Sequence, residues 1–167
     1  MPNIRTATKE ELYIIRQIAS VTYSPTYLSI LGQEQVDYML EEIYSPAALL
    51  QQLEQGHTFL IVEENSKELG FAAYSLLDGV NQVYKLQKIY VLPEFQGRGL
   101  GRGLITEVIS RVQQQGGEKL RLNVNRFNSA KSYYEKTGFK VIATVDIPIG
   151  RGFFMNDYVM ELDIPGN

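Results

Sequence analysis

The sequence predicts a single domain of mixed α/β structure over residues 1–167, with runs of antiparallel strands and one β-α-β unit near the centre. Three observations lead to this prediction. Apolar residues recur at helical spacing in the first third of the chain, the spacing changes to strand alternation from Thr58, and a strand, a glycine-rich turn and a long helix then follow one another. The length suffices for one core, and no repeat or long linker divides it.

The first part of the chain predicts a short strand, residues 4–8, followed by three helices. Thr8 is placed to cap the first helix. The other two helices span residues 34–44 and 45–56. The Ser-Pro pair that opens the last of them supplies a capping hydroxyl and a proline at the first helical position, where its missing N–H costs nothing.

The middle of the chain predicts three strands. Residues 58–64 and 68–77 are joined by a short polar turn, so we expect them to form an antiparallel hairpin. Residues 82–92 form the next strand, and Pro93 stops it. This strand leads directly into a glycine-rich segment.

The second half predicts a long helix that carries an apolar stripe from Leu100 to Val112 and ends at the glycine pair 116–117. The remaining expected elements are a strand at residues 119–124, a helix at 129–137, and two strands at 139–145 and 157–162.

Composition excludes several kinds of site. The chain has no cysteine, which excludes disulfides, thiolate metal sites and a cysteine nucleophile. His57 is its one histidine, so a multi-histidine metal site is also excluded and we expect no metal. No apolar run approaches the roughly 18 residues that a membrane span needs, and the N-terminus lacks the apolar core of a signal peptide. We therefore expect a cytoplasmic protein with no membrane partner.

The net charge of −3 conceals an asymmetry between the two halves of the chain. Residues 1–80 carry a balance of −7, and residues 81–167 carry +4. One interpretation is two differently solvated faces. The other is a split active site, in which the basic half meets an anionic cofactor and the acidic half a cationic substrate. The acidic total and the lack of a basic stripe disfavour nucleic-acid binding.

Residues 94–103 read EFQGRGLGRG, and we call them the glycine segment. A strand that ends in a glycine-rich turn and opens a helix leaves several N–H groups unpaired and pointing one way. The helix dipole adds partial positive charge there, and the two arginines of the segment add full charges. Without Cβ atoms, a phosphate can approach the main chain closely. The segment therefore predicts a diphosphate site, although a turn that merely packs tightly remains an alternative.

Two familiar phosphate-binding patterns do not fit the glycine segment. No glycine of the chain is followed by Lys and then Ser or Thr, as a P-loop requires. The dinucleotide pattern G-x-G-x-x-G fails as well, since Arg102 and Leu104 occupy the positions where the third glycine would stand. A nicotinamide or flavin dinucleotide module is therefore disfavoured.

The stretch IYVLPEFQGRGLGRGLI resembles the acetyl-CoA-binding motif of the GCN5-related N-acetyltransferase (GNAT) family, whose pattern Q/R-x-x-G-x-G/A is met by Gln96, Gly99 and Gly101. A second stretch, NVNRFNSAKSYYEKTGF, resembles the downstream segment of the same family. The resemblance covers nearly the whole chain. It implies the acyl-CoA N-acyltransferase fold, with a central, mostly antiparallel, twisted sheet flanked by helices, and an enzyme that transfers an acetyl group from acetyl-CoA directly to an amine.

The resemblance also implies the cofactor-binding residues. Main-chain groups of the strand before the glycine segment would bind the pantetheine arm, and those of the segment itself would bind the diphosphate. Arg98 or Arg102 would reach the 3′-phosphate. Asn128 would bind the pantetheine amides, although its position also suits a helix cap. The cofactor-binding set is thus Ile89, Tyr90, Val91, Gln96, Gly97, Arg98, Gly99, Leu100, Gly101, Arg102 and Asn128.

Tyr134 matches the family tyrosine that protonates the departing CoA thiolate, which makes it the expected catalytic residue. The reaction gains from such a group because the tetrahedral intermediate collapses more easily when the thiolate leaves as a thiol. Spacing alone favours a core aromatic side chain for Tyr134, and the match to the family is what favours the catalytic role.

The base that deprotonates the amine is not evident. Many family members place a glutamate on the strand before the glycine segment, but residues 82–92 contain no carboxylate. Candidates in the acidic half are Glu34, Asp37, Glu41 and His57, each of which also suits a solvated surface position. Water and direct deprotonation of the amine by solvent are the alternatives, and we assign the base to none of these residues.

The acceptor is expected to be a primary amine of a small molecule or a peptide. The tail of the sequence resembles diamine and polyamine N-acetyltransferases, and the acidic N-terminal half would suit a polycation. The tyrosine-rich residues 23–44 are the expected acceptor wall. A homodimer is an expectation by analogy. The competing hypothesis is a non-catalytic acyl-CoA-binding or regulatory module with the same fold.

Overall fold

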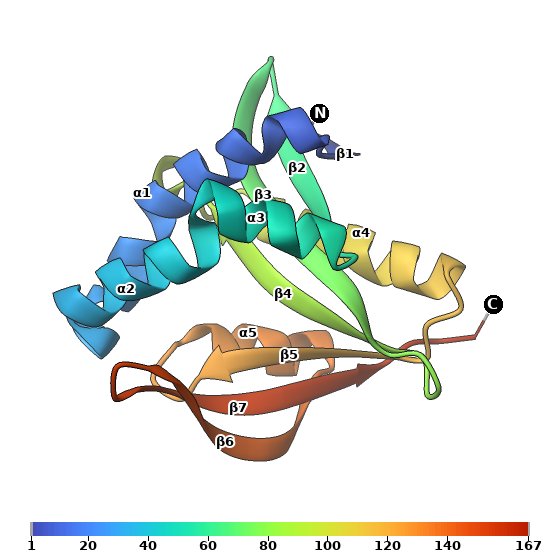
Figure 1. Ribbon diagram of the computed structural model, residues 1–167. Coiled ribbons are helices and arrows are strands. Elements are labelled where there is room, and N and C mark those ends of the chain that lie inside the picture. The colour runs from blue at the N-terminus through green and yellow to red at the C-terminus, as the bar shows by residue number, and fades with distance from the viewer. Residues whose placement is uncertain (1, 167) are drawn as a thin grey trace. The chain divides into compact units, whose positions relative to one another are not determined.

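The computed structural model describes residues 2–166 (Figure 1). It has the mixed α/β architecture that the sequence predicts, with a seven-stranded, mostly antiparallel sheet in the order β1-β2-β3-β4-β5-β7-β6. The strands are β1 (Asn3–Thr6), β2 (Thr58–Glu64), β3 (Lys67–Asp78), β4 (Val83–Val91), β5 (Lys119–Asn125), β6 (Lys140–Gly150) and β7 (Phe153–Asp163). The α-helices are α1 (Leu12–Leu31), α2 (Gln33–Tyr44), α3 (Pro46–Glu54), α4 (Leu100–Gln114) and α5 (Ala130–Thr137). Short 3-10 helices, η1 (Lys9–Glu11) and η2 (Pro93–Phe95), precede α1 and the glycines.

The chain forms two compact units. The first unit contains the chain up to Ser75 together with Lys88–Val108, and the second contains Leu76–Gln87 together with the chain from Ile109 onward. Strands β3 and β4 and helix α4 each run from one unit into the other. The sequence-based assignment of one domain to residues 1–167 stays a prediction.

The first unit is built around the β2–β3 hairpin. Thr58 pairs with Tyr74 and Glu64 with Lys67, so the two strands are antiparallel as predicted. The turn between them places Asn65 and Ser66 at positive φ, which suits its short polar residues. The middle of β2 is buried, with Phe59, Leu60 and Ile61 showing no exposed surface.

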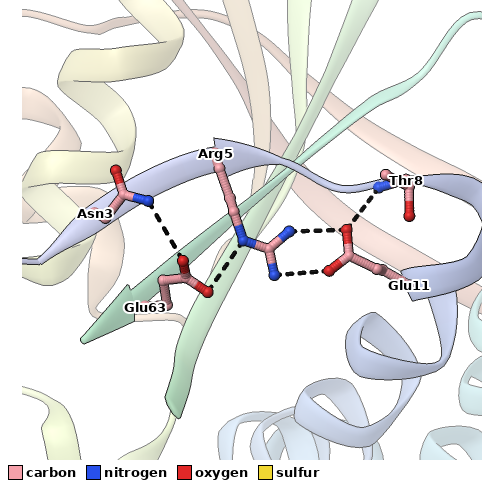
Figure 2. A network of polar contacts seen from close by, with 5 residues as sticks. All are labelled: Asn3, Arg5, Thr8, Glu11 and Glu63. Atoms are coloured by element: carbon pink, nitrogen blue, oxygen red, sulfur yellow. Dashed lines mark hydrogen bonds and ion pairs between the residues drawn. The ribbon is translucent and has the colours of Figure 1, made fainter. Parts of the chain in front are cut away.

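A polar network fastens the start of the chain to this hairpin (Figure 2). Arg5 on β1 donates to Glu63 on β2 and to Glu11 in η1, at 3.0 and 2.8 Å. Glu11 also accepts the backbone N–H of Thr8 at 3.0 Å, which is one half of a capping box. These contacts lower the pKa of Glu11 to about 2, chiefly through its hydrogen bond with Arg5. The expected role of Thr8 at a helix start is confirmed, and η1 is the first turn that it caps.

The second unit contains the parallel pair of the sheet. Val83–Leu86 of β4 run parallel to Lys119–Leu122 of β5, as the predicted β-α-β unit requires. On its other side β5 pairs with β7 in the antiparallel direction over its whole length, from Lys119↔Asp163 to Asn125↔Asp157. The core of the second unit includes Leu120, Leu122 and Met160, which are at most 2% exposed.

The last two strands are longer than the sequence predicts. The expected strands 139–145 and 157–162 left residues 146–156 unassigned, whereas β6 and β7 extend through them to a tight hairpin (Figure 1). The turn uses Gly150, Arg151 and Gly152, all at positive φ. Two glycines separated by one residue indicate a turn in the sequence. Residue propensities alone did not show how far the strands on either side of this turn extend. The correction matters for Asp157, which lies within β7 and not at its start.

Candidate functional site

The end of β4 carries the residues expected to bind pantetheine. A Cβ on Gly70 of β3 would lie 2.6 Å from the carbonyl oxygen of Tyr90, so β3 approaches the β4 backbone as closely as only glycine permits. The N–H of Leu92, just after β4, donates to the carbonyl oxygen of Leu69 on β3 at 2.8 Å. Because backbone groups alternate between the two edges of a strand, those of Ile89 and Val91 point away from β3. Ile89 and Val91 therefore present main-chain groups to the open side of the strand, as pantetheine binding would need, whereas the main-chain groups of Tyr90, the third predicted residue, face β3.

Gln96 ties the glycine segment back to this strand. Its side-chain Nε2 donates to the carbonyl oxygen of Val91 at 3.1 Å. The short helix η2 turns the chain between Val91 and Gln96, and the N–H of Gln96 donates to the carbonyl oxygen of Pro93. Gln96 thus has a structural role that accounts for a glutamine at this point of the motif, and the structure brings the two predicted cofactor-binding segments together in the first unit.

Helix α4 begins with a set of N–H groups that its own backbone does not use. Its first backbone bond runs from Gly103 N–H to the carbonyl oxygen of Gly99, at 3.0 Å. The N–H groups of Leu100, Gly101 and Arg102 precede that bond and have no partner within the helix. Together with the dipole of a helix of 15 residues, they form an arrangement that suits an anion.

The glycines of the segment are needed for different reasons. Gly97 and Gly99 have φ of +80° and +81°, a conformation that is strained for any residue with a Cβ. Gly101 has no positive φ, and a Cβ on it would meet no atom within 4 Å. A glycine inside a helix costs about 1 kcal/mol relative to alanine. Nothing in the fold explains Gly101, which fits a position that a ligand approaches.

The two arginines of the segment have different surroundings. Arg98 donates to Glu64 on β2 at 2.8 Å and stacks over the Phe95 ring at 5.8 Å. This hydrogen bond holds the pKa of Glu64 below its usual value. Arg102 lies exposed on the first turn of α4. Of the two arginines predicted to reach a 3′-phosphate, Arg98 would have to leave a carboxylate in order to do so.

Asn128 lies in the second unit, in the turn between β5 and α5. Its side-chain oxygen accepts the N–H of Ala130 at 2.9 Å, so it serves the start of the helix as the sequence suggested. The side-chain nitrogen of Asn128 carries two donors that this bond does not use, because an amide has donors as well as an acceptor. Helix capping and ligand binding therefore remain compatible.

Tyr134 lies in the middle of α5 and is 8% exposed. Its ring packs edge-on against Tyr133 and Phe139, at centroid distances of 5.6 and 5.7 Å. Gly138 ends the helix with φ of +113° and lets Phe139 return to this contact. The packing suits a core aromatic and equally fixes the direction of a phenol, so the catalytic role of Tyr134 stays a prediction.

The expected acceptor wall contains core residues as well as surface residues. Tyr23 and Tyr44 are 3% and 2% exposed and belong to an aromatic cluster, with ring centroids 5.9 Å apart. Burial raises the pKa of Tyr44. The three carboxylates considered as bases on α2, namely Glu34, Asp37 and Glu41, are exposed.

Lys88 is a functional candidate that sequence reasoning missed. Its ammonium lies 5.5 Å from the Tyr44 ring centre and 5.4 Å from that of Phe59, and it donates to the side-chain oxygen of Gln52. Burial among these groups lowers its pKa to about 8. The sequence shows that this lysine directly precedes Ile89 on the strand expected to bind pantetheine. Only the packing of α2, α3 and β2 around Lys88 changes its chemistry.

Asp157 is the second missed candidate. It is 4% exposed, and its Oδ1 is buried without a hydrogen-bond partner among residues 2–166. Burial raises its pKa above the usual value, against the smaller opposing effects of Asn123, Lys85 and Arg126. A carboxylate in an apolar strand is a signal of this kind of site. It was overlooked because the strand was expected to begin at Asp157.

Comparison with known proteins decides the family. The profile of the acetyltransferase (GNAT) domain matches residues 27–162, which is well over half of the chain. The chain belongs to the GNAT family. It is an N-acetyltransferase that uses acetyl-CoA, so the resemblance, the fold class, the reaction and the co-substrate expected from the sequence are confirmed. The non-catalytic alternative is not favoured.

Individual relatives agree with this assignment. A spermidine N(1)-acetyltransferase of Thermoplasma acidophilum is 28% identical over 144 residues, covering 83% of this chain and 88% of the relative. A ribosomal protein bS18-alanine N-acetyltransferase of Haemophilus influenzae is 35% identical over 91 residues, covering 53% and 60%. The crystal structure of the PaiA N-acetyltransferase from Thermoplasma acidophilum in complex with coenzyme A superposes with a TM-score of 0.82 at 26% identity, over 98% of this chain and 99% of that one.

No helix among residues 2–166 is long and apolar enough to cross a membrane.

Proposed function

We propose that this acetyltransferase acts on primary amines of small molecules, with polyamine-like amines preferred. The acidic balance of −7 in residues 1–80 supports a cationic acceptor. The relative named a spermidine N(1)-acetyltransferase supports a polyamine, whereas the relative named for the alanine of a ribosomal protein keeps a peptide N-terminus as the second candidate.

The glycine segment is the diphosphate site in this proposal. The observation that carries it is Gly101, a helical glycine that neither backbone conformation nor packing requires. The main-chain N–H groups from Gly97 to Arg102 bind the diphosphate, and Leu100 contributes through its backbone alone because its side chain is buried. Arg102 is the better placed of the two arginines for the 3′-phosphate, since Arg98 is held by Glu64.

The remaining predicted residues complete the binding of the co-substrate. Main-chain groups of Ile89 and Val91 bind the pantetheine arm, whereas those of Tyr90 face β3. The side-chain nitrogen of Asn128 donates to one of the carbonyl oxygens of the arm. The amine nitrogen attacks the thioester carbonyl, so that a C–N bond forms and the C–S bond breaks. The hydroxyl of Tyr134 gives its proton to the departing thiolate.

The wider setting is also part of the proposal. Residues 1–167 act as a single N-acetyltransferase domain in the cytoplasm, as a homodimer and without a nucleic-acid partner.

Thiol release from acetyl-CoA tests the acceptor class directly, because a chain without cysteine gives no protein background. We expect release with spermidine and other polyamines at a kcat/KM at least tenfold above that with an alanine-ended peptide or free amino acids. A higher rate with the peptide would assign the enzyme to protein N-termini instead. Release that is independent of any amine would contradict an amine acceptor altogether.

A further inference from the structure

Asp157 is the buried charged group of the second unit whose position the fold alone does not explain. It lies between two strands, opposite Asn125 of β5 and Val145 of β6. Its Oδ2 accepts a 3.4 Å hydrogen bond from Asn123, and its Oδ1 has no partner in the described chain. Leaving a buried carboxylate oxygen unpaired lowers the stability of the fold, because its desolvation is not compensated. Such a group in a stable fold points to a missing partner.

The neighbouring cations do not supply that partner. Arg126 directs its Nη2 to the carbonyl oxygen of Val145 and to Asp146, at 2.8 and 2.6 Å. Its Nε is itself buried and has no hydrogen-bond partner in the part of the chain that the structure describes. Lys85 on β4 is close enough to act on the charge of Asp157, yet burial lowers the pKa of this lysine. The two cations thus favour an ionised carboxylate without occupying its free oxygen.

Glu161 is a second carboxylate on the same face of the sheet, and its charge is paired within the chain. Glu161 lies on β7 four residues after Asp157, so both side chains point to the same side of the sheet. Lys119 and Arg121 hold Glu161 at 2.9 and 2.6 Å. Glu161 is fully paired within the chain, whereas Asp157 is not.

The position of Asp157 along β5 links it to the predicted site residues of its own unit. Its partner Asn125 is the last residue of β5, and Asn125 accepts the N–H of Phe127 in the turn that leads to Asn128. Beyond Leu122, β5 continues its pairing with β7 after its register with β4 has ended. The free carboxylate oxygen therefore lies at the end of β5 from which α5 and Tyr134 follow.

We propose that Asp157 binds the ammonium group of the acceptor amine and takes the proton that this group must lose. An ammonium has three donors and no acceptor, which matches an unpartnered carboxylate oxygen. The ammonium transfers one proton to Oδ1 and becomes a neutral amine, whose lone pair then attacks the thioester carbonyl. As the C–S bond breaks, Tyr134 protonates the thiolate, and the second proton that the nitrogen loses on becoming an amide restores the phenol. This inference rests on the proposed function and supplies the carboxylate that strand 82–92 lacks.

The first test compares Asp157→Asn with Glu161→Gln, a change of the paired carboxylate on the same strand. We expect Asp157→Asn to lower kcat/KM for spermidine by about 10²–10⁴-fold, the usual contribution of a general base, while the KM for acetyl-CoA changes less than threefold. Glu161→Gln should keep kcat/KM within threefold. The proposal is overturned if Asp157→Asn retains activity within threefold of the parent enzyme.

Two further readouts separate proton transfer from a structural effect. The kcat/KM of the parent enzyme should fall at acid pH as Asp157 is protonated. This acid limb of the pH profile should be absent from the residual activity of Asp157→Asn. With trifluoroethylamine, whose fluorines keep it uncharged near neutral pH, the same substitution should cost less than tenfold. An unchanged acid limb contradicts the assignment. If Lys88→Met loses the acid limb instead, Lys88 and not Asp157 takes the proton from the amine.

Amine binding without turnover distinguishes this inference from the proposed function. Calorimetry of spermidine with the CoA-bound enzyme should show binding that Asp157→Asn weakens at least tenfold. If the parent enzyme releases no thiol with any amine, the proposed function fails, and this titration still decides the inference. Equal affinities of the two proteins, or no binding to either, would overturn the role of Asp157.

Discussion

The glycine segment and the surroundings of Asp157 show two different ways to prepare a ligand site. The segment offers main-chain N–H groups, and its side chains matter mainly by being absent, as at Gly97, Gly99 and Gly101. The second region offers one buried side chain, Asp157, whose oxygen the fold leaves unpaired. We infer that changes in the segment should alter co-substrate binding, whereas changes at Asp157 and Tyr134 should alter turnover.

After Asp157→Asn, the largest effect on turnover is expected from Tyr134→Phe. Removing the phenol proton should lower kcat by about 10²-fold or more, because the thiolate must then leave unprotonated, while the KM for acetyl-CoA stays within threefold. Tyr133→Phe is the matched control, since its ring lies next to that of Tyr134 on the same helix. Steady-state kinetics with a saturating amine measures both. A kcat of Tyr134→Phe within threefold of the parent would make this side chain a core aromatic only.

Gly101→Ala should separate binding from folding. Alanine is the better helix former, so the unliganded protein should melt at the same temperature or slightly higher. The added methyl group meets open space in the protein but would contact a bound diphosphate, and we expect at least a tenfold loss of acetyl-CoA affinity. Gly103→Ala, where the methyl would meet only Ile4 at 3.8 Å, is the control. Thermal shifts with and without acetyl-CoA give both quantities, and equal ligand shifts in the two variants would contradict a diphosphate site at Gly101.

The arginines of the segment should differ in a smaller way. Arg102→Met should reduce the preference for CoA over 3′-dephospho-CoA by roughly three- to tenfold, as expected for a partly solvated charged contact. Arg98→Met should reduce it less, since Arg98 is already paired with Glu64. Competition of the two CoA forms against acetyl-CoA measures the preference. A larger loss in Arg98→Met would show that this arginine exchanges Glu64 for the phosphate.

The smallest effect concerns the Arg5–Glu11–Glu63 network, which lies outside both regions (Figure 2). The pKa of Glu11 in the folded protein, about 2, lies below its ordinary value of 4.5. A lowered carboxyl pKa stabilises the fold above pH 4.5, and this contribution is lost as the pH falls toward 2. The side chains of Arg5 and Glu11 are both about a quarter exposed. Solvent therefore weakens their ion pair, and Glu11→Gln should lower the unfolding free energy by only about 1 kcal/mol at neutral pH.

Urea unfolding at several pH values checks this prediction. The difference in unfolding free energy between the parent and Glu11→Gln should shrink toward zero between pH 4.5 and pH 2. Glu10→Gln, an exposed neighbour, should show no such difference. A gap that grows at low pH would contradict the sign.

The sequence sufficed for the parts of this protein that are local. The order of elements, the capping of α3 by Ser45 and the glycine segment are set by residues within a few positions of one another. The length of β6 and β7 could not be read in this way, since pairing with a partner strand carries them through residues 146–156.

The same limit applies to the site. The lowered pKa of Lys88 depends on Gln52, Tyr44 and Phe59 from three other elements. The unpaired oxygen of Asp157 depends on where Asn123 and Arg126 direct their hydrogen bonds. Motifs identify groups that bind through the backbone, whereas the chemistry of a buried side chain follows from packing between distant segments.

An amide titration by nuclear magnetic resonance tests the role of the glycine segment most directly. CoA and pantetheine share the thiol arm, and only CoA carries the diphosphate. We predict that the amide signals of Gly97, Gly99 and Gly101 shift on addition of CoA and remain in place with pantetheine, while signals of Ile89–Val91 respond to both. Glycine signals that ignore CoA, or that respond equally to pantetheine, would contradict a backbone site for the diphosphate.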